Sequence, residues 1–88
     1  MRIVILYHPQ SDHSRIVEEY THDFMRRNPE VKMESLSVDT LVGARTAELH
    51  DIMQYPSMIA LRDDNSMVKS WVGLPLPLMN EVAYFSFT

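Results

Sequence analysis

The sequence predicts one α/β domain over residues 1–88, in which a four-stranded mixed sheet is flanked by helices. Three observations lead to this fold class. An apolar, β-branched run opens the chain, and a segment whose apolar residues recur at helical spacing follows it. This change from strand to helix then occurs a second time. Finally, two further apolar runs on either side of the turn residues 63–66 indicate a hairpin.

The first strand is predicted at Ile3–Leu6, because a continuous run of such residues suits a strand covered on both faces. The polar segment His8–Asp12 ends this run and starts a helix, which Ser11 or Asp12 is expected to cap. The residues on the inward face of this helix are expected to be Ile16, Val17, Tyr20, Phe24 and Met25. The helix should stop at Asn28-Pro29, because the residue before a proline avoids helical backbone angles.

A second strand is expected over Val31–Asp39, so that strand, helix and strand form a βαβ unit with a right-handed crossover. The next helix is predicted within Thr40–Met53. Glycine in a helix interior costs about 1 kcal/mol, so we expect Gly43 to delay the regular helix until about Arg45. The residues that this helix turns inward are expected to be Leu49, Ile52 and Met53.

The chain breaks again at Tyr55-Pro56-Ser57 before a strand at Met58–Arg62. The turn cluster Asp63–Ser66 then predicts a hairpin with the return strand Met67–Val72. Pro77 suits the first turn of a short final helix. The residues of that helix that can face the sheet are Leu78, Met79, Val82 and Phe85. The predicted order of elements is therefore β-α-β-α-β-β-α.

Charge and composition exclude several classes of function. The chain has 8 Lys and Arg residues against 12 Asp and Glu, a net charge of −4, which argues against a nucleic-acid surface. It contains no cysteine, which excludes disulfides, thiolate metal sites and cysteine nucleophiles. The apolar run Ile3–Leu6 is too short to span a membrane and lacks the features of a signal peptide. We therefore expect a cytoplasmic protein without a membrane partner.

Three short motifs lie at the starts or ends of predicted strands. The first strand runs into Ser11-Asp12-His13-Ser14, a proline opens the third strand in Tyr55-Pro56-Ser57, and the last strand ends in Trp71-Val72-Gly73. The set resembles the thioredoxin and glutaredoxin superfamily over nearly the whole chain. That resemblance implies a thioredoxin-like fold, places Pro56 where the family has its cis-proline, and puts Ser11 and Ser14 on the two cysteine positions of the Cys-x-x-Cys motif. Glutathione-binding members have an acidic cluster after the last strand, which this chain lacks, so we expect no cofactor.

Serine at these positions changes the chemistry that the resemblance implies. In the family, unpaired N–H groups and the helix dipole stabilise a thiolate. A serine hydroxyl is far more basic, and a dipole effect of about 1–2 kcal/mol does not ionise it near neutral pH. A serine nucleophile with His13 as its base would need a third group to orient the imidazole, and the adjacent Asp12 rarely gives that geometry. We expect instead that Ser11 or Asp12 caps the helix and that His13 is solvated.

The histidines, methionines and C-terminal aromatic residues allow further expectations. The spacing of the four histidines, His8, His13, His22 and His50, matches no compact ligand motif, so we expect no metal site. Five methionines are expected to pack in the core, namely Met25, Met33, Met53, Met58 and Met79. If the last helix ends near Tyr84, so small a domain cannot bury both Phe85 and Phe87, and an apolar patch would remain for a dimer contact.

Three hypotheses about function follow. The first is a redox-inactive thioredoxin-like module that binds a protein or peptide partner, with an extended segment adding beside Pro56. Its candidate binding residues are Ser11, Asp12, His13, Ser14, Tyr55, Pro56 and Ser57. The second is a thiol–disulfide oxidoreductase in which both cysteines were deliberately replaced by serine. The third is a structural subunit that forms a homodimer through its aromatic tail.

Overall fold

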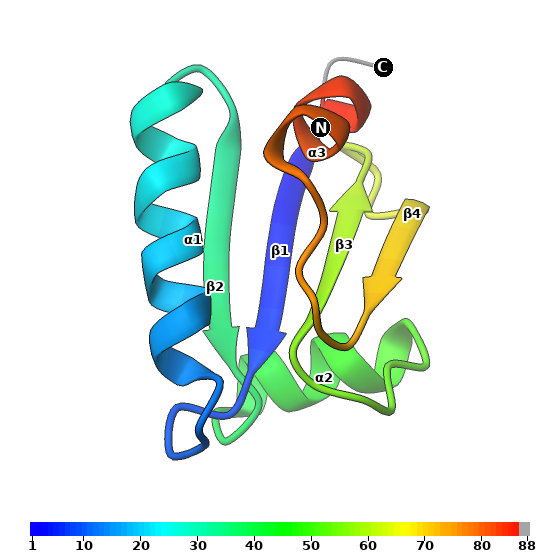
Figure 1. The fold of residues 1–88 in the computed structure, drawn as a ribbon. Helices are drawn as coiled ribbons and strands as arrows, with labels where there is room; N and C mark the ends of the chain where they lie inside the picture. The colour runs from blue at the N-terminus through cyan, green and yellow to red at the C-terminus, as the bar shows by residue number, and fades with distance from the viewer. Residues whose placement is uncertain (87–88) are drawn as a thin grey trace.

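The computed structural model describes residues 1–86, which form four strands and three helices (Figure 1). The strands are β1 (Arg2–Tyr7), β2 (Lys32–Ser37), β3 (Ser57–Leu61) and β4 (Met67–Val72). The helices are α1 (Ser14–Arg27), α2 (Leu41–Leu49) and α3 (Met79–Ser86). The predicted order of elements is confirmed. None of these described helices has the length and apolar character needed to cross a membrane.

The sheet has the strand order β2-β1-β3-β4. β1 is parallel to β2, with Arg2 opposite Lys32, because α1 carries the chain back from the end of β1 to the start of β2. β3 runs antiparallel to β1 and forms a hairpin with β4. The central strands β1 and β3 are therefore paired on both sides, whereas β2 and β4 are the edges.

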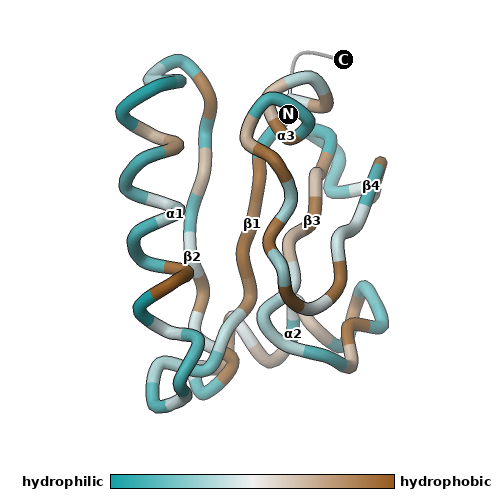
Figure 2. The backbone as a smooth tube through the Cα atoms, in the orientation of Figure 1, coloured by the Kyte–Doolittle hydropathy of each residue, from teal (hydrophilic) through white to brown (hydrophobic). Residues whose placement is uncertain are grey.

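Alternate residues of β1 face two separate cores. Odd-numbered residues such as Ile5 pack with Phe24 of α1 and Val82 of α3 on one face of the sheet. Even-numbered residues such as Leu6 pack with Ala47 of α2 on the other. Figure 2 shows the resulting apolar centre, in which β1 and β3 are the most hydrophobic strands. This arrangement explains why the first strand reads as a continuous apolar run.

Several residues that the pattern predicts to face inward are exposed. On α1, Val17 and Phe24 are fully buried, but Ile16 and Met25 are exposed, because the side of the helix that meets the sheet is centred on the first two. Leu78, which precedes α3, is exposed as well. The remaining inward predictions for the last helix agree with the structure, since Val82 is buried and both Met79 and Phe85 pack partly buried against the core. Of the methionines, Met33 and Met58 are buried as expected. Phe87 lies outside the described residues.

The start of α2 differs from its prediction. The helix begins at Leu41 rather than near Arg45, because the Thr40 hydroxyl oxygen accepts a hydrogen bond from the Gly43 N–H at 3.1 Å and caps it. Gly43 lies inside the helix for a steric reason. A Cβ atom at this position would come within 1.9 Å of the Ser37 carbonyl oxygen. The glycine therefore allows the close approach between the end of β2 and α2.

The inward face of α2 also differs from the prediction. Gly43 and Ala47 are its buried residues, whereas Leu49 and Met53, which we expected to be buried, are exposed. Ile52 is buried as expected. The close packing of Gly43 against Ser37 explains the change, since it turns the small residues of α2 toward the sheet and the larger Leu49 toward solvent.

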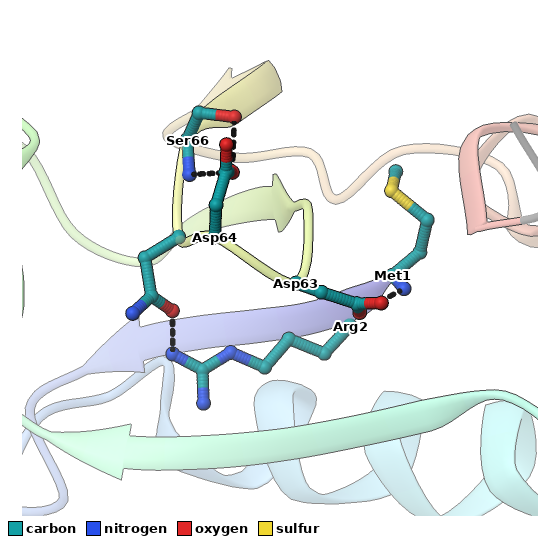
Figure 3. A network of polar contacts seen from close by, with 6 residues as sticks. Met1, Arg2, Asp63, Asp64 and Ser66 are labelled. Carbon is teal, nitrogen blue, oxygen red and sulfur yellow. Dashed lines mark hydrogen bonds and ion pairs between the residues drawn. The ribbon is translucent and has the colours of Figure 1, made fainter.

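Polar contacts close the end of the sheet at which β1 begins (Figure 3). The N-terminal ammonium group of Met1 lies 3.0 Å from Oδ1 of Asp63, and Arg2 donates a hydrogen bond to Asn65 at 2.8 Å. Asp64 accepts hydrogen bonds from the N–H and hydroxyl groups of Ser66. These partners lower the pKa values of Asp63 and Asp64. The predicted turn at 63–66 is thus confirmed. The motifs of the candidate site lie at the opposite end of the sheet.

Candidate functional site

The segment between β1 and α1 forms the first part of the candidate site. The carbonyl oxygen of His8 accepts two hydrogen bonds from Ser11, from its N–H at 3.1 Å and from its hydroxyl at 2.6 Å. The Ser14 N–H then donates to the Ser11 carbonyl at 3.3 Å. Consecutive turns therefore lead from the strand to the helix. The predicted cap is wrong, because Ser11 bonds backward, Asp12 is exposed, and the N-cap residue His13 makes no side-chain capping bond.

The side chain of His13 stabilises this segment through a hydrogen bond to its backbone. Its Nε2 atom accepts a hydrogen bond from the backbone N–H of His8 at 3.1 Å, which requires an unprotonated Nε2. Burial and the proximity of His8 lower the pKa of His13, and the charge of Asp12 opposes this shift. The expectation of a solvated His13 is therefore wrong, since its ring is half-buried and serves as a structural acceptor.

His8 connects this segment to the rest of the site. Its ring meets the Tyr55 ring edge-on, with centroids 4.9 Å apart, and its Nδ1 lies 3.9 Å from Oδ1 of Asp39. The Val38 N–H donates to the Tyr7 carbonyl at 3.0 Å and brings the end of β2 alongside. His8 was not among the residues that the sequence singled out for binding. The sequence signal that could have identified His8 as a site residue is its position directly after a buried strand.

The proline loop forms the second part of the site. The Tyr55–Pro56 peptide bond is cis. Pro56 is buried, and its carbonyl oxygen accepts a hydrogen bond from the Gly73 N–H at 2.9 Å. Ser57 is also buried, and its hydroxyl donates to the Gln54 carbonyl at 2.6 Å. The Pro56 carbonyl and the Ser57 hydroxyl therefore stabilise the loop through hydrogen bonds.

Tyr55 differs from these neighbours because its backbone is free to pair. Its hydroxyl donates to the Ile52 carbonyl at 3.2 Å, and its side chain is half-buried. Within residues 1–86, neither its N–H nor its carbonyl oxygen makes a hydrogen bond. A pair of unused backbone groups can bond to an extended segment of another chain.

A hollow of about 380 Å³ opens beside Tyr55, and we refer to it as the Tyr55 hollow. Its lining is mainly apolar and comes from the site, the end of β2 and α2: His8, Val38, Ala44, Ala47, Glu48, Ile52, Met53 and Tyr55. A hollow of this size and lining can receive an apolar side chain.

The predicted site residues are only partly brought together. His13 and Tyr55 both contact His8, so the two motifs do meet. Among the described residues, however, no hydrogen bond joins Ser11 or Ser14 to Pro56 or Ser57, and none joins a serine hydroxyl to His13. The same part of the chain contains no group of three His, Asp or Glu side chains arranged to hold a metal ion.

Comparisons with known proteins concern the fold. No protein-family model and no curated protein sequence matches the chain. Thioredoxin 1 from Thermosipho africanus TCF52B superposes with a TM-score of 0.69 and 13% identity, over 97% of this chain and 89% of that one. A thioredoxin from Fasciola hepatica gives a TM-score of 0.72 and 15% identity over 97% and 76%. Mitochondrial thioredoxin 3 from Saccharomyces cerevisiae, in its oxidized form, gives 0.72 and 10% over 97% and 74%. The chain therefore has a thioredoxin-like fold, as the sequence predicts.

Proposed function

We propose that this chain is a thioredoxin-like binding module that recognises an extended segment of a protein or peptide and is inactive in redox chemistry. The unpaired backbone of Tyr55, next to buried Pro56, is the observation that carries the proposal. Thiol–disulfide exchange requires a thiolate that attacks a disulfide, and this chain has no cysteine. Binding at the proline loop needs no sulfur atom.

The backbone of Tyr55 and the Tyr55 hollow would act together. An extended segment aligned with Tyr55 gains one or two backbone hydrogen bonds, each worth about 0.5–1.5 kcal/mol net. This is too little for useful affinity, so a side chain must add apolar burial. The apolar residues Val38, Ile52 and Met53 of the hollow would receive that side chain. We therefore expect a partner segment that places a large apolar residue beside the residue that pairs with Tyr55.

The test uses peptides rather than a known partner. A library of random nonapeptides displayed on phage is selected against the full chain, and the selected peptides are titrated into ¹⁵N-labelled protein. We expect the largest amide shifts at Tyr55 and in residues 8–14. Each peptide is then N-methylated at successive positions. Strand pairing predicts that methylation of the amide facing Tyr55 weakens binding at least tenfold, and that methylation of the next amide, which points away, has little effect.

Two outcomes would overturn the proposal. One is selected peptides whose amide shifts avoid Tyr55, and the other is equal tolerance of N-methylation at both positions. Pro56→Ala should weaken binding, with circular dichroism showing that the variant still folds. Pro29→Ala serves as the matched control, because Pro29 is exposed beyond the end of α1.

The oxidoreductase remains a second candidate, and one observation favours it. The hydrogen bond from the Ser14 N–H to the Ser11 carbonyl closes a turn that brings these two positions together at the start of α1. The sequence of the encoding gene tests it. Cysteine codons at both positions would replace the binding module with an enzyme of thiol–disulfide exchange, whereas serine codons would eliminate this candidate.

A further inference from the structure

The side of α2 that faces away from the sheet is unusually apolar. Leu41, Val42 and Leu49 are 66%, 63% and 71% exposed, although α2 has only nine residues. The spacing of these residues places them on one face of the helix, around Arg45. Helices at the surface of globular proteins normally turn polar residues to solvent, and a helix that is apolar on its outer side indicates a covering partner. We call the set Leu41, Val42, Arg45, Glu48 and Leu49 the α2 face.

Two opposite charges lie within the α2 face. Arg45 and Glu48 are both exposed, and neither charged side chain has an ion-pair or hydrogen-bond partner among residues 1–86. On α1, by contrast, two ion pairs form within the helix: Arg15 pairs with Glu19, and Arg26 with Asp23. The α2 face therefore has one unpaired positive charge, on Arg45, and one unpaired negative charge, on Glu48, and apolar residues lie on both sides of them along the helix.

We propose that a second copy of this chain docks on the α2 face, with the two α2 helices packed antiparallel about a two-fold axis. Such an axis reverses the order of residues, so the face must complement itself. With the axis between Thr46 and Ala47, Arg45 and Glu48 lie at equal distances of about 2 Å along the helix on either side of it. Arg45 of one copy then meets Glu48 of the other, and the pairing occurs twice.

The same axis also matches the apolar residues. Each residue advances the helix by about 1.5 Å, so Leu49 lies about 4 Å from the axis and Val42 of the second copy about 7 Å from it on the same side, which leaves the two residues about 3 Å apart along the helix. Leu41 extends this contact at the outer end. The Thr46 hydroxyl, which donates to the Val42 carbonyl at 2.8 Å, is satisfied within its own helix and does not need water. Along the α2 face, apolar residues are followed by Arg45, Glu48 and a further apolar residue. This order makes the face complementary to the reversed face of a second copy.

The size of the α2 face limits how strong this dimer can be. A nine-residue helix is about 13 Å long, so the contact is smaller than the roughly 800 Å² per partner of a standard interface. The proposal is therefore a weak dimer that forms reversibly with concentration. In so small a contact the two ion pairs stay close to solvent, so salt should weaken the dimer.

Analytical ultracentrifugation of the full chain over a range of concentrations, at low and high salt, tests the proposal. We expect a monomer–dimer equilibrium that shifts toward monomer at high salt. Arg45→Glu and Glu48→Arg should each raise the dissociation constant at least tenfold, because each places like charges opposite each other twice. An equimolar mixture of the two variants should restore a heterodimer. A parent chain that stays monomeric throughout, or a mixture that associates no better than either variant, would overturn the proposal.

Matched apolar variants separate this surface from the rest of the molecule. Leu49→Gln should abolish association, whereas Leu78→Gln, at a residue that is 72% exposed away from α2, should not affect it. Tyr84→Ala examines the aromatic tail in the same way. Because all three side chains are exposed, none of these variants should lower the thermal stability of the monomer appreciably. Dissociation by Leu78→Gln or Tyr84→Ala, with Leu49→Gln still dimeric, would place the contact elsewhere and refute the α2 pairing.

Discussion

The backbone N–H of His8 donates a hydrogen bond to Nε2 of His13 at 3.1 Å, and this contact ties the end of β1 to the start of α1. The imidazole must remain neutral at Nε2 to accept that bond. The lowered pKa of His13 agrees with this requirement. Because the His8 ring in turn contacts Tyr55, the protonation state of one histidine bears on the geometry of the whole candidate site.

Acid should destabilise the fold through His13. In the unfolded chain a histidine titrates near pH 6.5, whereas the folded protein holds the pKa of His13 lower. Between these two values the unfolded chain binds more protons, so the free energy of unfolding falls as the pH is lowered below about 6.5. Urea unfolding at pH 7.5 and 5.5 should show a larger loss for the parent than for His13→Asn. His22→Asn, at an exposed position, should behave like the parent. Equal losses in all three proteins would contradict this prediction.

Gly43→Ala should be strongly destabilising. Helix propensity alone would favour alanine by about 1 kcal/mol. The added Cβ would, however, meet the Ser37 carbonyl oxygen at 1.9 Å, and we expect a loss of about 3 kcal/mol or more from this overpacking. Ala44→Gly, at the exposed neighbouring position, should lose only about 1 kcal/mol. Urea unfolding of both variants measures the difference, and a stabilised Gly43→Ala protein would show that the close contact is absent.

Tyr20 should make the fold sensitive to alkali. Its hydroxyl donates to the Pro77 carbonyl at 2.8 Å, and burial together with Glu81 raises its pKa to about 12. The unfolded chain loses this proton first as the pH rises, so stability should fall from about pH 10 upward. Tyr20→Phe should cost about 1 kcal/mol at neutral pH and remove this alkaline loss. Absorbance at 295 nm follows the ionisation. A difference between parent and variant that titrates near pH 10 would be inconsistent with a buried, bonded Tyr20.

Cysteines placed at positions 11 and 14 should form a disulfide. The hydrogen bond from Ser14 to Ser11 closes a turn, and turns of this kind hold the two Cα atoms less than about 7 Å apart. Disulfides span Cα distances of about 4.4–6.8 Å. Oxidised Ser11→Cys/Ser14→Cys should therefore lose two hydrogens by mass spectrometry and regain them with a thiol reductant. Ser11→Cys/Ser66→Cys, whose positions lie at opposite ends of the sheet, should keep free thiols as a monomer. Two free thiols in the first variant after oxidation would mean that the turn does not form.

Local sequence signals were sufficient for most of the fold. The β3–β4 hairpin was predicted with the correct bounds for β4, because Asp63–Ser66 is a strong turn cluster and the return strand Met67–Val72 follows it directly. The end of α1 was correct because Asn28-Pro29 stops a helix through its own backbone. The side chain of Asn28 adds a bond to the Phe24 carbonyl.

The errors have a common physical origin. The start of α2 was placed too late because the intrinsic cost of Gly43 was visible in the sequence, whereas the carbonyl of Ser37 against which it packs was not. The same error reversed the expectation for Leu49, which is exposed. The capping role of Ser11 was also misjudged, because α1 begins only at Ser14 and the Ser11 hydroxyl donates instead to the His8 carbonyl. In each case a specific contact outweighed a local preference.

The amino-acid sequence by itself determines which reactive side-chain atoms this protein contains. Ser11 and Ser14, which the sequence resemblance predicts to occupy the two cysteine positions, have oxygen in place of sulfur, and the absence of cysteine excludes thiol chemistry whatever the fold. The residues that form the candidate site depend instead on the packing of distant segments. His8 meets Tyr55 only because β1 and β3 lie side by side, and Tyr55 keeps its backbone unpaired because the Pro56 carbonyl is the group that bonds to Gly73. No local pattern contains these contacts, since they join residues that are far apart along the chain.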